Sequence, residues 1–247
     1  MKRISLAICL FLLISACAPA LKCEAGNCTR VLFVGNSYTC VNDLPNTFAQ
    51  LANAGGHAVE VDMVAPGGAT LADHVNSGDM LEKLKGTQWN YVVLQEQSLI
   101  PSVEDSFTAL MIPAARTLIT QIRQYKATPL LFITWAHRDG YPEAGLNSYE
   151  AMQFSIDNNY LRLGQGLNVA SVPVGFAWQS AAHRQPSFEL WQSDGSHPTG
   201  TGTYLAACVF YATIFHQSPN GLAYRGDLSK GTAQALQEIA SKTVLGK

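Results

Sequence analysis

The chain has 247 residues, of which 47% are hydrophobic and 14% are charged. That is enough apolar material for one sizeable core and too little chain for two comfortable domains. The formal net charge is -2 at pH 7, and no run of lysine or arginine interrupts the sequence. A groove for nucleic acid needs a concentrated basic face, so we do not expect nucleic acid as a partner.

The first residues have the features of an export signal. A short positive head precedes an apolar stretch at residues 6–14 that is too short for a permanent transmembrane helix, which predicts a signal peptide over residues 1–16. The sequence Ile-Ser-Ala-Cys that ends at Cys17 resembles the lipobox of bacterial lipoproteins, and this resemblance implies that Cys17 carries lipid. Ordinary cleavage after Ala20 is the alternative, and it also exports the protein. We therefore expect a cell-envelope protein, periplasmic or at the surface, whose membrane contact is its lipid anchor.

The exported part is predicted to hold a short linker at residues 17–29 and a single domain over residues 30–247. Besides Cys17, this part contains four cysteines: Cys23, Cys28, Cys40 and Cys208. The first two are close enough in sequence to close a small loop, whereas the last two could meet only through the fold. An oxidising compartment permits both pairs, but spacing does not establish connectivity. No Cys-x-x-Cys motif or histidine-rich cluster occurs, so structural or free thiols are expected and no metal site is.

From residue 30 onward, short apolar runs alternate with segments of helical spacing. In chain order the predicted elements are strand 31–34, helix 44–54, strand 57–64, helix 71–84, strand 91–94, helix 107–125, strand 130–134, helix 149–163, strand 169–174, a long loop at 181–202, helix 204–215 and helix 228–244. Strand–helix alternation predicts an α/β fold, with about five parallel strands covered by helices on both faces. Ligand sites in such sheets lie beyond the carboxyl ends of the strands, so the segments after each strand are the candidates for function.

Polar and small residues follow the first three predicted strands. Ser37 follows the first, where a helix would direct N–H groups at a developing negative charge, although a capping serine in a plain turn fits equally well. The glycine pair that ends at Gly68 follows the second; it would let a backbone N–H approach a ligand, as an oxyanion hole requires, or would simply turn the chain. Gln-Glu-Gln-Ser follows the third, where Gln95 or Gln97 could donate an amide N–H to an oxyanion or bond within the loop.

The loop ahead of the 204–215 helix holds a close aspartate–histidine pair. Asp194 and His197 lie three residues apart among glycine, serine and proline. A histidine base must be held in the right tautomer by a carboxylate on its other nitrogen, and this spacing lets one loop present both groups. A turn-capping aspartate beside a surface histidine is the alternative. His137 follows the fourth strand and could line the cleft, as a substrate contact or as a structural group.

These segments, in this order, resemble the SGNH hydrolase superfamily, also called GDSL-type esterases and lipases. The family pattern has a serine in a Gly-Asp-Ser-like block, a later glycine, an asparagine in a Gly-x-Asn-Asp block and a terminal Asp-x-x-His. Here Ser37 matches the first block, Gly68 the second, and Asp194 with His197 the last, over about residues 30–216. The resemblance implies a three-layer, flavodoxin-like α/β/α fold and a catalytic triad of Ser37, His197 and Asp194. It also implies an oxyanion hole that includes the N–H groups of Ser37 and Gly68, and no metal or organic cofactor.

The sequence departs from the family pattern at two places. Asn36 replaces the usual aspartate, which removes a charge beside the nucleophile. In the third block, Gln97 stands by position where the family has asparagine and would supply the same amide donor on a longer arm, with Gln95 as the alternative. A lost oxyanion donor costs about 2.7–4 kcal/mol of transition-state stabilisation, so this block decides how active the site is.

We therefore expect a serine esterase that acts on short-acyl esters, with acetylated carbohydrate as the favoured substrate. Gln95, Trp135 and Trp191 are candidate substrate contacts, and the two tryptophans could stack on sugar faces or pack around the loop. The alternative from another class is a glycan-binding envelope lipoprotein that keeps the fold and has weak or no turnover. The altered third block motivates this alternative, because fold does not establish function.

Overall fold

The computed structural model describes residue 23, residues 28–184 and residues 188–246. The predicted signal peptide and the lipid-bearing Cys17 lie outside these described residues. Within the described part, no helix is both long and apolar enough to cross a membrane.

A five-stranded parallel sheet forms the centre of the molecule, in the order β2-β1-β3-β4-β5. Its strands are β1 (Thr29–Val34), β2 (Val59–Val64), β3 (Tyr91–Leu94), β4 (Thr128–Phe132) and β5 (Ala170–Val172). The inner strands β1, β3 and β4 are almost wholly buried, as continuous apolar runs between two helical layers must be. The prediction of an α/β fold with five parallel strands is confirmed.

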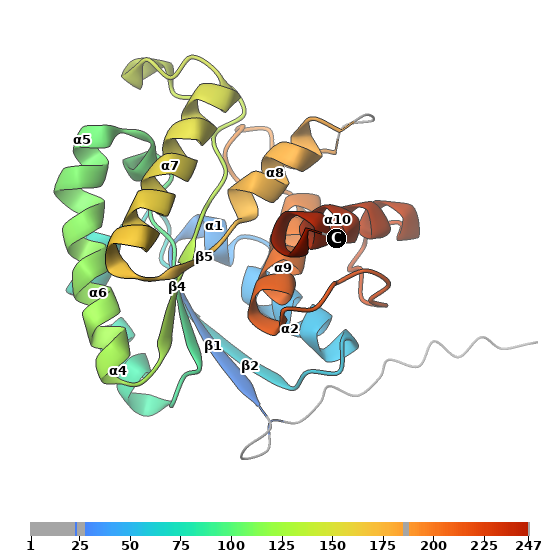
Figure 1. The fold of residues 1–247 in the computed structure, drawn as a ribbon, viewed down its shortest axis with the longest axis horizontal. Helices are drawn as coiled ribbons and strands as arrows, with labels where there is room; N and C mark the ends of the chain where they lie inside the picture. Colours follow the sequence, from blue (N-terminus) through green and yellow to red (C-terminus); the bar gives the residue numbers. More distant parts are fainter. Residues whose placement is uncertain (1–22, 24–27, 185–187, 247) are drawn as a thin grey trace, which may run out of the picture.

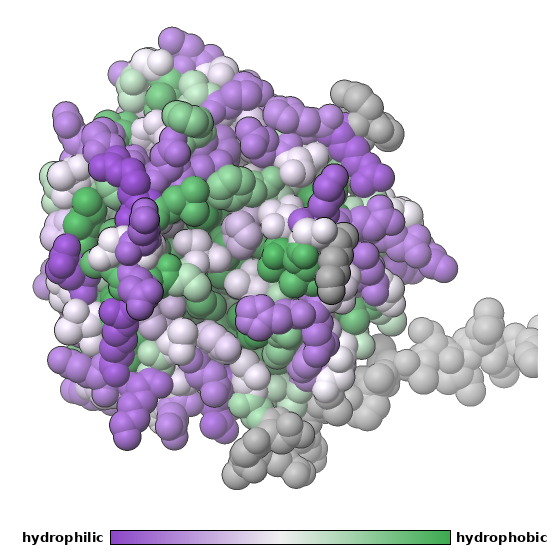
Figure 2. All heavy atoms as spheres, in the orientation of Figure 1, coloured by the Kyte–Doolittle hydropathy of each residue, from purple (hydrophilic) through white to green (hydrophobic). Residues whose placement is uncertain are grey.

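Helices cover both faces of the sheet (Figure 1). On one side lie α2 (Leu44–Ala54), α9 (Gly200–Phe215) and α10 (Lys230–Leu245), and on the other lie α4 (Gly78–Gly86), α6 (Ile112–Gln124) and α7 (Tyr149–Leu167). Helix α9 is apolar on nearly every side because α2, α8 (Val174–Ala182) and α10 all pack on it. In the same orientation, Figure 2 shows hydrophilic side chains over the outer helices and a mixture of hydrophobic and neutral ones nearer the centre.

Short helical segments follow the ends of several strands. They are α1 (Ser37–Cys40), α3 (Leu71–Val75), α5 (Glu104–Ser106), the 3-10 turns η1 (Ile100–Ser102) and η3 (Pro142–Ala144), and the π-helical turn η2 (Phe107–Met111). The predicted helix 71–84 is wrong as one element, because Ser77 accepts a hydrogen bond from the Met80 N–H and starts α4 anew. The π turn η2 leads into Pro113, which has no N–H to donate to an ordinary α-helical ladder.

The cysteines behave differently from one another. A disulfide joins Cys23 to Cys28, so the closely spaced pair does close a small loop. Cys40 and Cys208 are free thiols, and Cys208 is fully buried in α9. The second pairing that an oxidising compartment would permit is therefore not made.

Candidate active site

The nucleophile candidate lies at the carboxyl end of β1. Ser37 is the first residue of α1, and Asn36 caps this helix by accepting a hydrogen bond from the Tyr38 N–H at 3.1 Å. The Asn36 N–H is bonded to Gln95 Oε1 at 2.9 Å. Between these two, the Ser37 N–H has no partner among the described residues. It is therefore free to donate to a group that approaches the serine hydroxyl.

The structure brings the three predicted triad residues together. Ser37 Oγ lies 2.9 Å from His197 Nε2, and His197 Nδ1 lies 2.5 Å from Asp194 Oδ2. The other carboxylate oxygen, Oδ1, accepts the backbone N–H groups of Ser196 at 2.9 Å and of His197 at 3.0 Å. Since the carboxylate accepts at Nδ1, the histidine carries its proton there and turns Nε2 as an acceptor towards the serine.

Hydrogen bonds set the charge of the triad carboxylate. The His197 ring, first, and then the two backbone N–H groups lower the pKa of Asp194 to about 2, although partial burial opposes them. Asp194 is therefore ionised at neutral pH and well into the acidic range. An ionised carboxylate at Nδ1 can also stabilise an imidazolium, which is the form that a histidine takes when it accepts a proton from a serine.

The glycine of the second block lies in an exposed turn next to the nucleophile loop. Gly68 has a φ of +73°, and a side chain of the usual hand is strained in that conformation. Asn36 Nδ2 donates to the Ala69 carbonyl at 2.9 Å, which ties this turn to the residue before Ser37. The asparagine that replaces the family's aspartate thus makes a donation that an ionised aspartate could not make.

The two glutamines of the third block have different roles. Gln95 is fully buried, and its Nε2 donates to Asn36 Oδ1 and to the Glu96 carbonyl. The prediction of Gln95 as a substrate contact is wrong, because both ends of its amide are used inside the protein. Gln97 is partly exposed; its Oε1 accepts the Leu99 N–H at 2.9 Å, and its Nε2 has no partner among the described residues. Of the two, only Gln97 has an amide N–H available to a ligand.

The tryptophan predictions fare differently. Trp135 is only 1% exposed and is stacked between Tyr38, at 4.6 Å, and Trp178, at 4.0 Å, so its prediction as a sugar-stacking platform is wrong. Its indole N–H donates to the Ser196 carbonyl and so holds the loop that contains Asp194 and His197, which we call the catalytic loop. Trp191 is partly exposed and donates to the Ala136 carbonyl. It stays a candidate contact.

Two buried titratable residues behind the site were missed by sequence reasoning. His74 Nε2–H donates to the Gly35 carbonyl at 2.7 Å, just ahead of the nucleophile. Glu96 Oε1 accepts the N–H groups of Leu71 and Gln97, at 3.0 Å and 2.7 Å, and so joins the second and third blocks. Burial raises the pKa of Glu96 to about 7 and lowers that of His74. A charged residue at the end of an apolar strand was the one available signal for Glu96.

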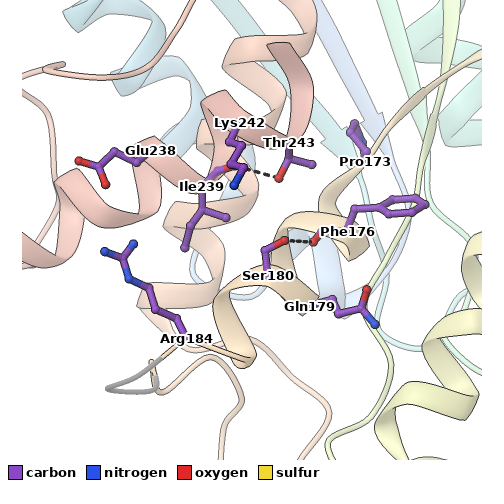
Figure 3. A pocket seen from close by; sticks show the side chains of 9 residues that line it. All are labelled: Pro173, Phe176, Gln179, Ser180, Arg184, Glu238, Ile239, Lys242 and Thr243. Atoms are coloured by element: carbon purple, nitrogen blue, oxygen red, sulfur yellow. Dashed lines mark hydrogen bonds between the residues drawn. The ribbon is translucent and has the colours of Figure 1, made fainter. Parts of the chain in front are cut away.

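A large pocket among the described residues lies away from Ser37, Asp194 and His197. It holds about 740 Å³ between α8 and α10 and is lined in part by Phe176, Arg184 and Lys242 (Figure 3). The hydroxyls of Ser180 and Thr243 in this pocket each donate to a carbonyl of their own helix. The pocket thus lacks the nucleophile and base that the carboxyl edge of the sheet brings together.

A metal site finds little support in the described residues. Cys23, Cys28 and Glu60 come close enough to share an ion. The two sulfurs form a disulfide, however, and so do not supply the thiolates that bind metals.

The chain is similar to known proteins in its fold. No protein-family model and no curated protein matches the sequence. A proposed SGNH hydrolase from Slackia heliotrinireducens is similar, with 28% identity and a TM-score of 0.66, over 76% of this chain and 100% of that one. The chain has the SGNH hydrolase fold.

Two further structures share the SGNH hydrolase fold with this chain. A DUF4886 family protein from Bacteroides uniformis gives a TM-score of 0.72 at 20% identity, over 88% of this chain and 95% of that one. An acetyl xylan esterase gives 0.57 at 12% identity, over 75% of this chain and 99% of that one. At these identities the likeness is one of fold. Esterases and lipases are prominent among the SGNH neighbours, which supports an ester hydrolase.

Proposed function

We propose that the protein is a serine esterase that removes short acyl groups, acetyl above all, from carbohydrate. The observation that carries this proposal is the continuous hydrogen-bonded line Ser37–His197–Asp194 at the carboxyl edge of the sheet. A buried or surface histidine without function has no need of a serine on one nitrogen and a carboxylate on the other.

In the proposed reaction His197 Nε2 takes the proton of Ser37 as the serine oxygen attacks the ester carbonyl carbon. The N–H groups of Ser37, Gly68 and the Gln97 side chain hold the oxyanion. His197 then gives its proton to the oxygen of the departing alcohol, which leaves an acyl-serine. Water, deprotonated by the same histidine, attacks the acyl carbon, and the histidine returns this proton to Ser37 Oγ as the acyl–serine bond breaks and the acid leaves. Each step needs only groups of this chain and water.

The proposal extends to the location of the protein in the cell envelope and to acetylated glycans as its substrate. Residues 1–22 lie outside the described residues, and their sequence supports export with a lipid on Cys17. An enzyme anchored in the envelope meets acetylated glycans, and the acetyl xylan esterase among the neighbours supports that substrate class. Fractionation of cells should find the full chain in the membrane fraction.

The test is hydrolysis of 4-nitrophenyl acetate, butyrate and octanoate by the purified protein beside Ser37→Ala. We expect the rate to fall with acyl length and to vanish in the variant. Ser180→Ala, an exchange of the same kind in the distant pocket, should keep full activity. Full activity of Ser37→Ala would refute the mechanism, and a preference for octanoate would refute the acyl group.

A glycan-binding protein without turnover is the second candidate, because the third block departs from the family pattern at Gln97. Labelling by a fluorophosphonate distinguishes the two candidates. An activated Ser37 should react rapidly, and Ser37→Ala should not react. A wild-type protein that binds glycans but resists the reagent would favour the binding function.

A further inference from the structure

A second polar cluster lies beside the triad and has no part in the proposed reaction. It contains the side chains of Tyr38, Ser98, His137 and Ser196. Ser98 Oγ and His137 Nε2 are 3.1 Å apart, and the Tyr38 hydroxyl lies 2.7 Å from Ser196 Oγ and close to the Ser98 hydroxyl. The Tyr38 ring meets the His197 ring edge-on, with centroids 5.9 Å apart. The cluster thus borders the catalytic imidazole.

Backbone contacts hold His137 next to the catalytic loop. The residue after it, Arg138, donates its N–H to the Gly195 carbonyl at 2.8 Å. Trp135, two residues before it, donates its indole N–H to the Ser196 carbonyl at 2.9 Å. His137 itself is half-buried, so one side of its ring faces Ser98 while part of the residue remains accessible.

The groups of this cluster are neutral at pH 7. Burial lowers the pKa of His137; Asp194 opposes this effect and His197 adds to it. Burial also raises the pKa of Tyr38 to about 12. A neutral imidazole and the hydroxyls of serine and tyrosine each donate one hydrogen bond and accept others. The hydroxyl groups of a sugar or other polyol likewise donate and accept hydrogen bonds, whereas alkyl chains do neither.

The order of the strands places this cluster relative to the substrate. Gly68 follows β2 and His137 follows β4, on opposite sides of Ser37, which follows β1 in the order β2-β1-β3-β4. In the proposed reaction the oxyanion lies between the Gly68 N–H and the amide of Gln97, which follows β3. The departing alcohol must lie near His197, which protonates its oxygen, and His137 adjoins the loop of His197. The alcohol part of the ester therefore lies on the side of His137.

We propose that His137, oriented by the buried Ser98 hydroxyl, hydrogen-bonds hydroxyl groups of the alcohol part of the ester through its accessible side, which selects a sugar or similar polyol. This inference rests on the proposed esterase function and replaces the stacking platform that the burial of Trp135 removes. His137 Nδ1 has no partner among the described residues, so an alcohol without hydroxyls that displaces water leaves this nitrogen unpaired, and sites built to bond a hydroxyl discriminate strongly for that reason.

The test compares two acetyl esters that differ only in the alcohol: an acetylated xylo-oligosaccharide and 4-nitrophenyl acetate. In His137→Ala we expect kcat/KM to fall by about tenfold or more for the sugar ester, mainly through KM, and by less than about twofold for the aryl ester. His137→Asn keeps a donor and an acceptor and should recover part of the loss. The matched control is His183→Ala, an exposed histidine at the end of α8, which should leave both esters unchanged.

Equal losses on both esters would mean that His137 acts on the triad or the fold and would overturn the inference, as would unchanged values on both. Ser98→Ala gives the same comparison if His137→Ala fails to fold. Failure of the esterase proposal is seen separately, as hydrolysis that survives in Ser37→Ala. A wild-type protein that cleaves the aryl ester by way of Ser37 but no sugar ester would overturn the carbohydrate assignment and this subsite together.

Discussion

Asn36 and Gln95 exchange two hydrogen bonds across the carboxyl ends of β1 and β3. The Asn36 N–H donates to Gln95 Oε1 at 2.9 Å, and Gln95 Nε2 donates to Asn36 Oδ1 at 3.0 Å. Both residues lie in blocks where the sequence departs from the SGNH pattern. Gly35 makes room for the pair, since a Cβ atom there would lie 2.4 Å from Gln95 Oε1. The two departures thus fit each other.

Asn36→Asp restores the family's residue and should lower both the stability and the activity of the protein. The carboxylate loses the donation to the Ala69 carbonyl and faces that oxygen with a charge, which should cost about 1–3 kcal/mol of unfolding free energy. Because this contact ties the Gly68 turn to Ser37, kcat should fall as well. Thermal melting and ester kinetics check both effects. Asn220→Asp makes the same exchange at an exposed position and should change neither stability nor kcat. An Asn36→Asp protein as stable and active as wild type would contradict the role given to the Asn36–Ala69 hydrogen bond.

Gln97 is expected to be the third oxyanion donor. Gln97→Ala should lower kcat about a hundred- to thousandfold with little change in KM, as loss of one such donor does elsewhere. Gln97→Glu removes the same N–H but keeps an oxygen for the Leu99 N–H, so it should lose kcat while melting closer to wild type. Full kcat in Gln97→Ala would exclude the donor role.

Glu96 should make stability fall as pH rises from about 4.5 to 7. The folded state raises its pKa to about 7, so in this window the folded protein holds a proton that the unfolded chain releases. Ionisation above pH 7 then costs a stability of order 3 kcal/mol. Glu96→Gln should flatten this slope in unfolding experiments from pH 4.5 to 8 and be more stable than wild type at pH 8. Asp157, whose burial raises its pKa to about 6, leaves a smaller slope in both proteins. An unchanged slope would contradict the prediction.

Gly202→Ala should destabilise the aromatic stack below the site. A Cβ atom at this position would lie 2.4 Å from Trp178 Cη2 and 2.7 Å from the Leu190 carbonyl oxygen. The Trp178 ring stacks on Trp135, and the Trp135 ring stacks on Tyr38. Overpacking of this kind costs about 1–3 kcal/mol, which chemical denaturation would measure. Gly200→Ala, in the same helix with open space around the new atom, is the matched control and should melt like wild type.

Local patterns predicted some elements well. The helix at residues 44–54 has the bounds of α2, because Asp43 caps its start, Pro45 suits its first turn and Gly55 ends it. The strand at residues 91–94 has the bounds of β3. The segment of α8 was not predicted as a helix, because its residues are apolar without a clear period and its stability comes from packing on α9 and α10.

Burial was harder to predict than position. Trp135 and Gln95 both follow strands, at the edge where ligands bind, and the sequence does not say whether such a side chain points into the cleft or into the core. The indole is covered by Trp178 and the amide is taken up by Asn36, and both partners are remote in sequence. Likewise, His74 and Glu96 acquire their roles only from contacts with other loops.

The sequence by itself determined the parallel α/β architecture and the edge of the sheet at which function had to be sought, because apolar periodicity and strand–helix alternation are local properties. It also singled out Asp194 and His197, since their spacing within one loop is local too, whereas Ser37 was assigned through the resemblance to the SGNH pattern. Only the tertiary structure decided that Gln97 rather than Gln95 has a free amide, and that His137 stands beside the catalytic loop. Those outcomes depend on which groups compete for the same hydrogen bonds after chain segments far apart in sequence have packed together.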